Sequence, residues 1–285
     1  MPLTNPRWRQ FAQTIHDSRP TRPTQTEYEF KIADCGRELL QAFGLLYREY
    51  LHAGYVQDNA AKLLFTKHHL LPETTVFVAK AQNRVLSTAT VVRDSPDFGL
   101  PMDDLYASEL HELRQQGRRI LEICSLASER HGFSRTGIQD FTRLLFLFCL
   151  NFNVDDVCIM VNPKHAPLYT CRCEFEILGE EKFYPRVNAP AIALRANSHM
   201  MREKLKNRPS SPITPSPVSA HCKAARFTLC DKVLCILQNG SNLPRLNPLN
   251  ADLIRTLLIH ADPSLRSLPP EYISFLQNEY PGLKI

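Results

Sequence analysis

Along the chain, segments in which apolar residues alternate with polar ones are interleaved with segments in which they recur every three or four positions. The first pattern and short apolar runs predict strands, listed here by range: 28–32, 75–81, 85–93, 120–127, 157–161, 175–183 and 191–194. The second pattern predicts helices, likewise listed: 35–53, 59–68, 103–116, 136–152, 163–169, 227–237, 249–258 and 272–276. Interleaved strands and helices indicate an α/β fold.

Local signals sharpen this outline. Asp34 is the expected N-cap of the first helix and Gly54 its end. The two strands around Gln82, Asn83 and Arg84 are expected to form a hairpin. The wholly apolar runs at 120–127 and 157–161, separated by a helix, are typical of parallel strands buried on both faces.

The composition changes along the chain and suggests four parts. Residues 1–26 are expected to form an N-terminal arm, and 27–200 the main domain. Residues 201–219 are expected to be a linker rich in proline and serine. Residues 220–285 then form a small helical extension whose apolar faces need a partner, either the main domain or another protein.

The bulk composition is that of an ordinary globular protein, with 44% apolar and 22% charged residues and a formal net charge of +5. No tract of Lys or Arg requires a nucleic-acid partner. The 9 cysteines lack the spacing of a metal site or a disulfide framework. No apolar segment is long enough to cross a bilayer. We therefore expect a cytoplasmic protein with no integral membrane segment and no bound metal.

Glu122 is the residue whose position most needs an explanation, because it lies within the apolar run from Ile120 to Ala127. A carboxylate in a doubly buried strand has to be paired, protonated or used, since burying an unpaired charge is costly. The turn-rich segment at 93–103 precedes this strand, and a loop and a helix follow it. This arrangement suggests an enzyme that handles an amine, with a structural ion pair to Arg93 as the alternative.

Several short motifs occur in a fixed order, from Tyr47-Arg48-Glu49-Tyr50 and Gly54-Tyr55-Val56, through Asp94-Ser95-Pro96, Gly99-Leu100-Pro101-Met102-Asp103, Glu122-Ile123-Cys124-Ser125-Leu126-Ala127 and Asn162-Pro163-Lys164-His165, to Gly179-Glu180-Glu181, Tyr184-Pro185 and Val187-Asn188-Ala189-Pro190-Ala191. Together they resemble the bacterial long-chain N-acyl amino acid synthases. These are relatives of the acyl-homoserine-lactone synthases, and a subset is associated with exosortase systems. The resemblance covers about residues 27–200. It implies the fold of the GCN5-related N-acetyltransferases (GNAT), a mixed central sheet flanked by helices.

The resemblance also implies the acyl donor. In that family, acyl chains come from the phosphopantetheine of acyl carrier protein, with no permanently bound cofactor. Coenzyme-A-using relatives carry a pyrophosphate loop before the helix at 136–152. Here this loop keeps Arg130 and Gly137 without the usual spacing, and Arg135 remains for a single phosphate. Acyl-coenzyme A is the alternative donor.

The resemblance assigns candidate roles to individual residues. Glu122 is the expected general base or ammonium ligand, and Tyr169 the expected acid for the leaving thiolate. The alternative for Tyr169 is a packing role. His165, one helical turn before it, is expected to be an exposed helix residue. Cys124, close to Glu122, is a buried small residue rather than a nucleophile.

Binding residues follow in the same way. The acceptor is expected to meet candidates listed as Arg48, Arg93, Ser125 and Asn188. Ser125 lies where the lactone synthases often have an arginine, so the residue that binds the acceptor's carboxylate stays open. The donor is expected to meet Arg130, Arg135, Gly137 and Phe148, although Phe148 is equally suited to the core. Scattered basic residues offer an acidic carrier protein a surface, and are listed as Lys67, Arg118, Arg119, Arg135, Arg143, Lys164 and Arg172.

The sequence thus predicts an N-acyltransferase that moves a medium or long acyl chain from acyl carrier protein to the amine of an amino acid or related small molecule. Two alternatives stay open. One is a coenzyme-A-dependent acetyltransferase of the same fold, and the other is a non-catalytic protein that senses acyl groups or acts as a scaffold.

Overall fold

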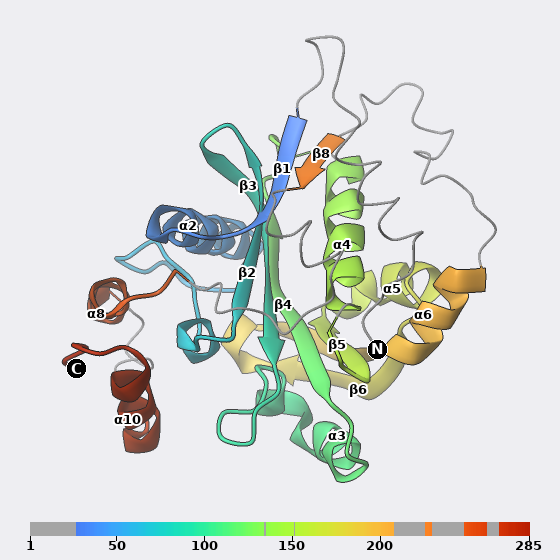
Figure 1. Ribbon diagram of the computed structural model, residues 1–285. Helices are drawn as coiled ribbons and strands as arrows, with labels where there is room; N and C mark the ends of the chain where they lie inside the picture. The colour runs from blue at the N-terminus through green and yellow to red at the C-terminus, as the bar shows by residue number, and fades with distance from the viewer. Residues whose placement is uncertain (1–26, 134, 151, 208–225, 230–247, 261–267) are drawn as a thin grey trace.

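The computed structural model describes residues 27–133, 135–150, 152–207, 226–229, 248–260 and 268–285 (Figure 1). Its strands are β1 (Glu27–Ile32), β2 (Thr75–Ala81), β3 (Arg84–Arg93), β4 (Ile120–Ser128), β5 (Asp156–Val161), β6 (Glu176–Tyr184), β7 (Ala189–Asn197) and β8 (Arg226–Leu229). Its helices are α2 (Gly36–His52), α3 (Asp103–Gln115), α4 (Arg135–Cys149), α5 (Ala166–Arg172), α6 (Ser198–Asn207), α8 (Ala251–His260) and α10 (Pro270–Glu279). Three 3₁₀ turns are η1 (Lys67–Leu70), η2 (Pro163–His165) and η3 (Pro185–Val187).

The strands form a single mixed sheet in the order β6-β7-β5-β4-β3-β2-β1-β8. Antiparallel pairs join β1 to β2, β2 to β3 and β3 to β4, whereas β4 and β5 are parallel. The crossover from β4 to β5 passes through α4, as a parallel pair requires. The expected α/β fold with a mixed central sheet, the hairpin and the parallel pair are confirmed.

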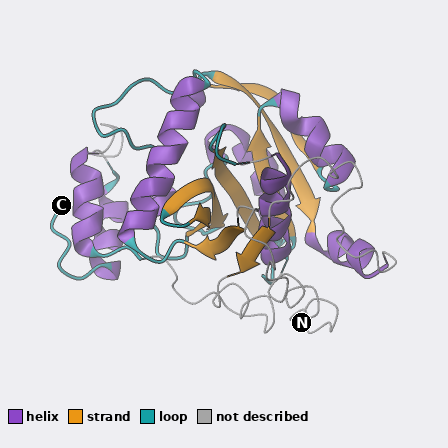
Figure 2. Ribbon diagram, turned by 90° about the horizontal axis from the view of Figure 1, so that it is seen from above, coloured by secondary structure: helices purple, strands orange, loops and turns teal. Residues whose placement is uncertain are grey.

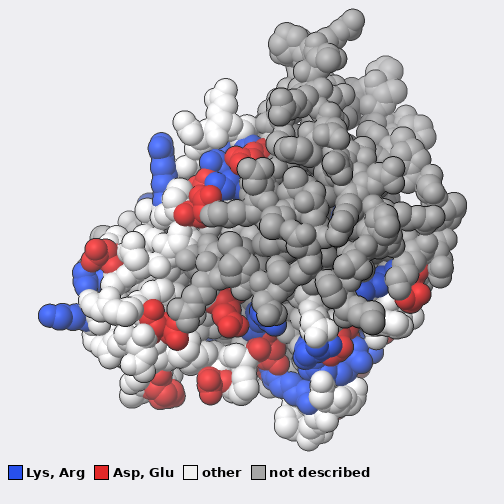
Figure 3. Space-filling view, viewed as in Figure 1, with Lys and Arg blue, Asp and Glu red and all other residues white. Residues whose placement is uncertain are grey.

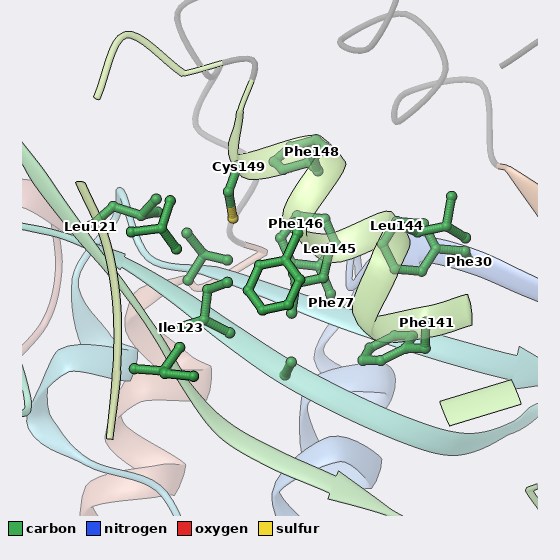
Figure 4. Close-up of a cluster of buried hydrophobic side chains, with 14 of the residues drawn as sticks. Phe30, Phe77, Leu121, Ile123, Phe141, Leu144, Leu145, Phe146, Phe148 and Cys149 are labelled. Atoms are coloured by element: carbon green, nitrogen blue, oxygen red, sulfur yellow. The ribbon is translucent and has the colours of Figure 1, made fainter. Parts of the chain in front are cut away.

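Helices cover both faces of this sheet (Figures 1 and 2). On one face, apolar residues of α4 such as Phe141 and Phe148 pack on Phe77 and Ile123 of the strands (Figure 4). On the other face lie α2 and α3, each with its own buried cluster. Because side chains alternate along a strand, successive residues of β4 face these two different environments.

The C-terminal helices α8 and α10 lie on the α2 side of the sheet (Figure 1). Ile254 of α8 and Leu276 of α10 are fully buried in the same cluster as Leu45 of α2 and Leu70 of η1. The expected C-terminal helices are confirmed, and their apolar faces are covered by the main body of the chain.

Three local predictions are wrong. The residue that precedes α2 is Cys35 rather than Asp34, whose carboxylate accepts a hydrogen bond from Lys31 at 3.0 Å. The helix expected at 59–68 is absent, and η1 is the only helical turn there. Lys62 has a positive φ of 53°, which a right-handed helix cannot include.

The third error concerns the segment at 227–237. Its described part, β8, is a strand that pairs parallel to β1, whose free edge supplies the hydrogen-bond partners. Helix α6 occupies the first part of the expected linker. The arm at 1–26 and the stretches 208–225 and 230–247 lie outside the described residues. No described helix combines the length and apolar character needed to cross a membrane.

Candidate active site

Glu122 lies in the middle of β4 and only 1% of it is exposed. Its neighbours across the sheet are Val92 of β3 and Cys158 of β5. It therefore projects from the sheet face that α3 covers, the face to which Val92 and Cys158 contribute buried side chains.

One hydrogen bond holds the Glu122 carboxyl group. Its Oε2 atom accepts from the backbone N–H of Met102 at 2.8 Å, whereas its buried Oε1 atom has no partner among the described residues. Burial raises the pKa of Glu122 to about 8, with the charges of Asp103 and Asp104 adding to the rise and the Met102 N–H opposing it. A carboxyl group with this pKa exchanges its proton near neutral pH, as a general base must.

Met102 is placed by the loop between β3 and α3, residues 94–102. Arg114 of α3 ties the two ends of this loop together. Its guanidinium forms a bidentate pair with Asp94 at 2.8 Å and a second pair with Asp103 at 2.7 and 2.6 Å. Asp103 also accepts from the Leu100 N–H at 2.6 Å. The Met102 N–H group that bonds Glu122 is therefore positioned by the side chains of Asp94, Asp103 and Arg114.

Beside Glu122 the sheet opens. The pairing of β4 with β5 ends at Ile123 and Ile159, although both strands continue. On the other side of β4, the register with β3 shifts between Ala127 and Cys124, and Ser125 there has a positive φ of 51°. This is a β-bulge, a feature that re-aims side chains and interrupts pairing. Backbone groups of β4 beyond Ile123 thus face an opening that an extended ligand can occupy.

Tyrosines from three other elements interact electrostatically with one another and with Cys124, next to this opening in β4. Burial raises the pKa of Tyr50 above its ordinary value, and Cys124, Tyr55, Tyr169 and Tyr184 add to the rise. Groups on both faces of the sheet therefore raise the pKa of Tyr50 of α2, since Tyr169 belongs to the buried cluster on the α4 side. Tyr169, Cys124 and Tyr50 are therefore close enough for their charges to interact.

Sequence reasoning missed Tyr50 and Tyr184 as site residues. Tyr50 follows the helical spacing of α2, and Tyr184 ends an alternating strand, so packing explains both. The available signal was that both tyrosines belong to the ordered motifs. Tyr50 ends the motif Tyr47-Arg48-Glu49-Tyr50, and Tyr184 begins Tyr184-Pro185, which Arg186 follows. Tyr184 donates a hydrogen bond to Asp104 at 3.1 Å, and Arg186 pairs with the same carboxylate at 3.2 Å.

Tyr169 itself is 8% exposed, and its ring lies edge-on to Phe175 at 5.9 Å. Burial raises its pKa to about 12, so the hydroxyl keeps its proton. Burial and the nearby Glu122 raise the pKa of Cys124 as well. A thiol in that state is a poor nucleophile.

Two buried histidines of η1, His68 and His69, pack beside β3 on the sheet face from which Glu122 projects. His69 bonds Thr90, the partner of Cys124 across the sheet, at 3.1 Å, and burial lowers its pKa to about 3. His68 bonds the Phe98 carbonyl at 3.2 Å through Nε2, and burial lowers its pKa to about 4. Its Nδ1 atom is buried without a partner among the described residues. Both rings are neutral at pH 7, so neither neutralises Glu122.

The candidate arginines lie apart from Glu122. Arg93 stands opposite Leu121 in the sheet, so its side chain projects from the face that α4 covers, opposite to that of Glu122. The structural ion pair between Arg93 and Glu122, which the sequence left open as an alternative, is therefore not formed. Arg48 is exposed and lines a shallow depression of about 710 Å³ with Arg37 and Arg84 on the outer surface.

Asn188 is the exposed residue at the turn between η3 and β7, with φ and ψ both 44°. Asparagine tolerates this left-handed conformation, so Asn188 serves as a turn-forming residue here. Ser125 lies within the β4 bulge and bonds the Cys124 sulfur at 3.7 Å. Ser125 is therefore at the opening, whereas Asn188 lies in the turn two residues after Arg186.

Three of the donor candidates, Arg130, Arg135 and Gly137, lie close in sequence to the start of α4, whereas Phe148 lies near its end. Arg130 pairs with Glu49 of α2 at 3.0 Å. Gly137 is a buried residue in the first turn of α4, and the Arg135 side chain lies outside the described part. Phe148 is fully buried, and its ring lies 4.6 Å from that of Phe77 within the core (Figure 4). The geometry allows a phosphate near Arg130 and gives Phe148 a packing role.

Taken chemically, these groups provide an acid–base carboxyl group and a protonated phenol on two sides of an opening in the sheet. The carboxyl group suits removal of a proton from an amine, and the phenol suits protonation of a departing thiolate. Unpaired backbone of β4 between them can bind the amide groups of an extended thioester substrate.

Comparison with known proteins gives a consistent picture. The family model "N-acyl amino acid synthase FeeM" matches residues 41–197. The solved structure of FeeM, an N-acyl amino acid synthase from uncultured soil microbes, is 28% identical, with a TM-score of 0.55 over 62% of this chain and 93% of that one.

Two more distant structures are also similar. The acyl-homoserine-lactone synthase LasI is 12% identical, with a TM-score of 0.47 over 60% of this chain and 90% of that one. The coenzyme-A-dependent synthase BjaI is 12% identical, with a TM-score of 0.47 over 78% and 96%. A comparison with curated protein sequences finds no match.

Proposed function

Because this chain belongs to the FeeM family of N-acyl amino acid synthases, and is therefore an acyltransferase with a GNAT-like fold, we propose its donor, acceptor and reacting groups. It transfers a medium or long acyl chain from the phosphopantetheine of acyl carrier protein to the amine of an amino acid or related small molecule. The buried carboxyl group of Glu122, with a pKa of about 8 beside the β4–β5 opening, is the observation that carries this proposal.

The reaction proceeds by direct attack. The acceptor reacts as its neutral amine: the nitrogen bonds to the thioester carbon and its proton passes to the Glu122 carboxylate, which releases that proton to solvent before the next turnover. The carbon–sulfur bond then breaks, and the thiolate takes a proton from the Tyr169 hydroxyl, which regains one from solvent. At pH 7 about a tenth of a carboxyl group with this pKa is ionised, enough for a base that exchanges protons in each turnover.

The donor is proposed to lie along β4 beyond Ile123, with its phosphate near the start of α4. A single phosphate needs fewer ligands than a pyrophosphate, and Arg130, which Glu49 engages, and Arg135 are the cations that the loop offers. On the face shown in Figure 3, basic side chains lie among acidic ones. Arg118 and Arg119, for instance, pair with Asp156 and Asp155.

The acceptor is proposed to lie on the α3 side of the opening, where Glu122 and Asp104 supply negative charge for its ammonium group. Ser125 and Asn188 flank that side. Arg186 pairs with Asp104 at 3.2 Å, whereas Arg48 lies on the outer surface and Arg93 on the opposite face of the sheet. We therefore place the acceptor's carboxylate near the turn between β6 and β7.

The decisive experiment incubates the pure protein with acyl carrier proteins bearing chains of different length and an amino-acid mixture, and reads the products by mass spectrometry. A parallel arm supplies the same chains on coenzyme A. We expect a new acyl amide from the carrier-protein arm. Product from the coenzyme A arm alone would show that acyl-coenzyme A, and not acyl carrier protein, is the donor. Ligand binding without product in either arm would favour the non-catalytic alternative.

Replacing Glu122 tests the mechanism itself. We expect Glu122→Gln to lower turnover at least tenfold, because the amide cannot accept the proton. Glu112→Gln, the same change at an exposed position of α3, is the matched control and should leave turnover unchanged. Wild-type rates in a folded Glu122→Gln protein would remove this residue from the reaction.

A further inference from the structure

Helix α10 contacts the loop that positions the partner of Glu122. The ring of Phe98, in the β3–α3 loop, lies 4.8 Å from the ring of Tyr272 and 4.8 Å from that of Phe275, edge-on to the first and steeply inclined to the second. Both α10 residues lie beyond the part of the chain, 41–197, that the family model matches. A segment outside the matched part therefore packs on the loop next to the proposed acceptor.

The same helix also holds η1. The Tyr272 hydroxyl donates to the Lys67 carbonyl, and Tyr280, which follows α10, donates to the Leu70 carbonyl at 3.1 Å. His68, between these two carbonyls, bonds the Phe98 carbonyl. Helix α10, η1 and the tip of the loop thus form one connected set of contacts.

The loop has little freedom to absorb a displacement at Phe98. Gly99 has a positive φ of 58°, and a Cβ atom there would lie 2.5 Å from the Asp103 carboxylate, so only glycine fits. Leu100 is bonded to the same carboxylate, and Met102 follows with its N–H on Glu122. A shift of Phe98 is therefore passed along four residues to the Glu122 carboxyl group.

Two polar atoms beside this loop are buried without a partner among the described residues, Oε1 of Glu122 and Nδ1 of His68. In each case another polar atom of the same side chain is bonded to the loop backbone, at Met102 and at Phe98. Unsatisfied buried polar atoms are rare and call for an explanation. A polar ligand next to the loop explains both.

We propose that α10 is a positioning element for the acceptor side of the site, acting through Phe98, and that the acceptor binds against the β3–α3 loop. This inference rests on the proposed function. Phe275 and Tyr272 are positioning residues, since they touch the loop and not the reacting atoms. Loosening their contact moves the acceptor ligands and leaves the thioester side, formed by β4 and α4, in place.

The test compares Phe275→Ala and Phe98→Ala with the conservative Phe275→Leu in the full-length protein. The control is Ile254→Val, which removes one methyl group from the buried apolar face of α8 and leaves the rings of Phe98, Tyr272 and Phe275 in place. We expect the KM for the acceptor to rise at least tenfold in the two alanine variants, with the KM for the donor within twofold. Phe275→Leu should restore most of the acceptor affinity. Equal acceptor KM values in the alanine variants and the control would overturn the proposal.

A second readout does not depend on activity. The amide hydrogen of Met102 should exchange at least ten times faster in Phe275→Ala than in the wild type or Ile254→Val, while amides of β5 are unchanged. If the wild-type protein forms no acyl amide, the proposed function fails, and this exchange measurement still decides whether α10 positions the loop. Unchanged exchange at Met102 would show that it does not.

Discussion

At the scale of single residues, Glu122 shows how burial prepares a group for proton transfer. Its pKa of about 8 lies above the ordinary carboxyl value of 4.5, because the apolar surroundings disfavour the charge. The ionised form is the base, so kcat/KM should rise with pH up to an apparent pKa of about 8. In Glu122→Gln that rise should disappear. A pH profile with single-turnover controls measures it, and an unchanged rise in the variant would assign the titration to another group.

The same shift has a consequence for stability. Between pH 5 and pH 8 the folded protein keeps the Glu122 proton, whereas the unfolded chain releases it. Stability from this group is therefore complete below about pH 4.5 and is lost as pH rises towards 8, by about 1.4 kcal/mol per pH unit. Glu122→Gln should gain stability relative to the wild type as pH rises through this window. Urea unfolding at pH 5, 6.5 and 8 measures the difference, and a constant difference would contradict the raised pKa.

The sequence reveals Glu122 because a charge within an apolar run stands out, but it does not reveal its partner. Met102 is 20 residues away in the chain and donates through its backbone, which carries no residue-specific signal. The sequence likewise does not reveal on which face of the sheet Arg93 lies, although Arg93 and Glu122 are on neighbouring strands. Only the register, set partly by the bulge at Ser125, places Arg93 on the opposite face.

At the scale of elements, the β3–α3 loop depends on Arg114, whose side chain is 29% exposed and forms two ion pairs. Arg114→Ala leaves the Asp94 and Asp103 carboxylates crowded together, and we expect it to lower the free energy of unfolding by about 2 kcal/mol. Arg255→Ala breaks an exposed pair on α8 and should cost less than about 0.5 kcal/mol. Urea unfolding compares the two variants, and equal costs would mean that the loop does not need Arg114.

Elements with strong periodicity were predictable, and those decided by distant partners were not. The spacing of Phe141, Leu144 and Phe148 fixes α4 because one apolar face is enough to define a helix. The segment at 226–229 is apolar enough for either helix or strand, and it is a strand because the edge of β1 pairs with it. Local pattern carries no information about such an edge.

At the scale of the whole molecule, the C-terminal helices and the main domain share one apolar cluster, so they should unfold together. Leu276 of α10 is fully buried with Leu70 of η1 and Val76 of β2. Removing its side chain leaves a cavity between the extension and the sheet, and Leu276→Ala should lower the free energy of unfolding by about 3 kcal/mol. Far-ultraviolet circular dichroism in urea measures this cost.

Whether the C-terminal helices and the main domain unfold together is tested by measuring the opening of each region separately. Hydrogen exchange of peptides from α10 and from β2 should give the same free energy of opening in the wild type, and Leu276→Ala should lower both by the same amount. An extension that docked as a separate unit would open first, with β2 unaffected by the substitution. That result would also weaken the link from α10 to Glu122, because a helix that detaches on its own cannot hold the β3–α3 loop in a single position.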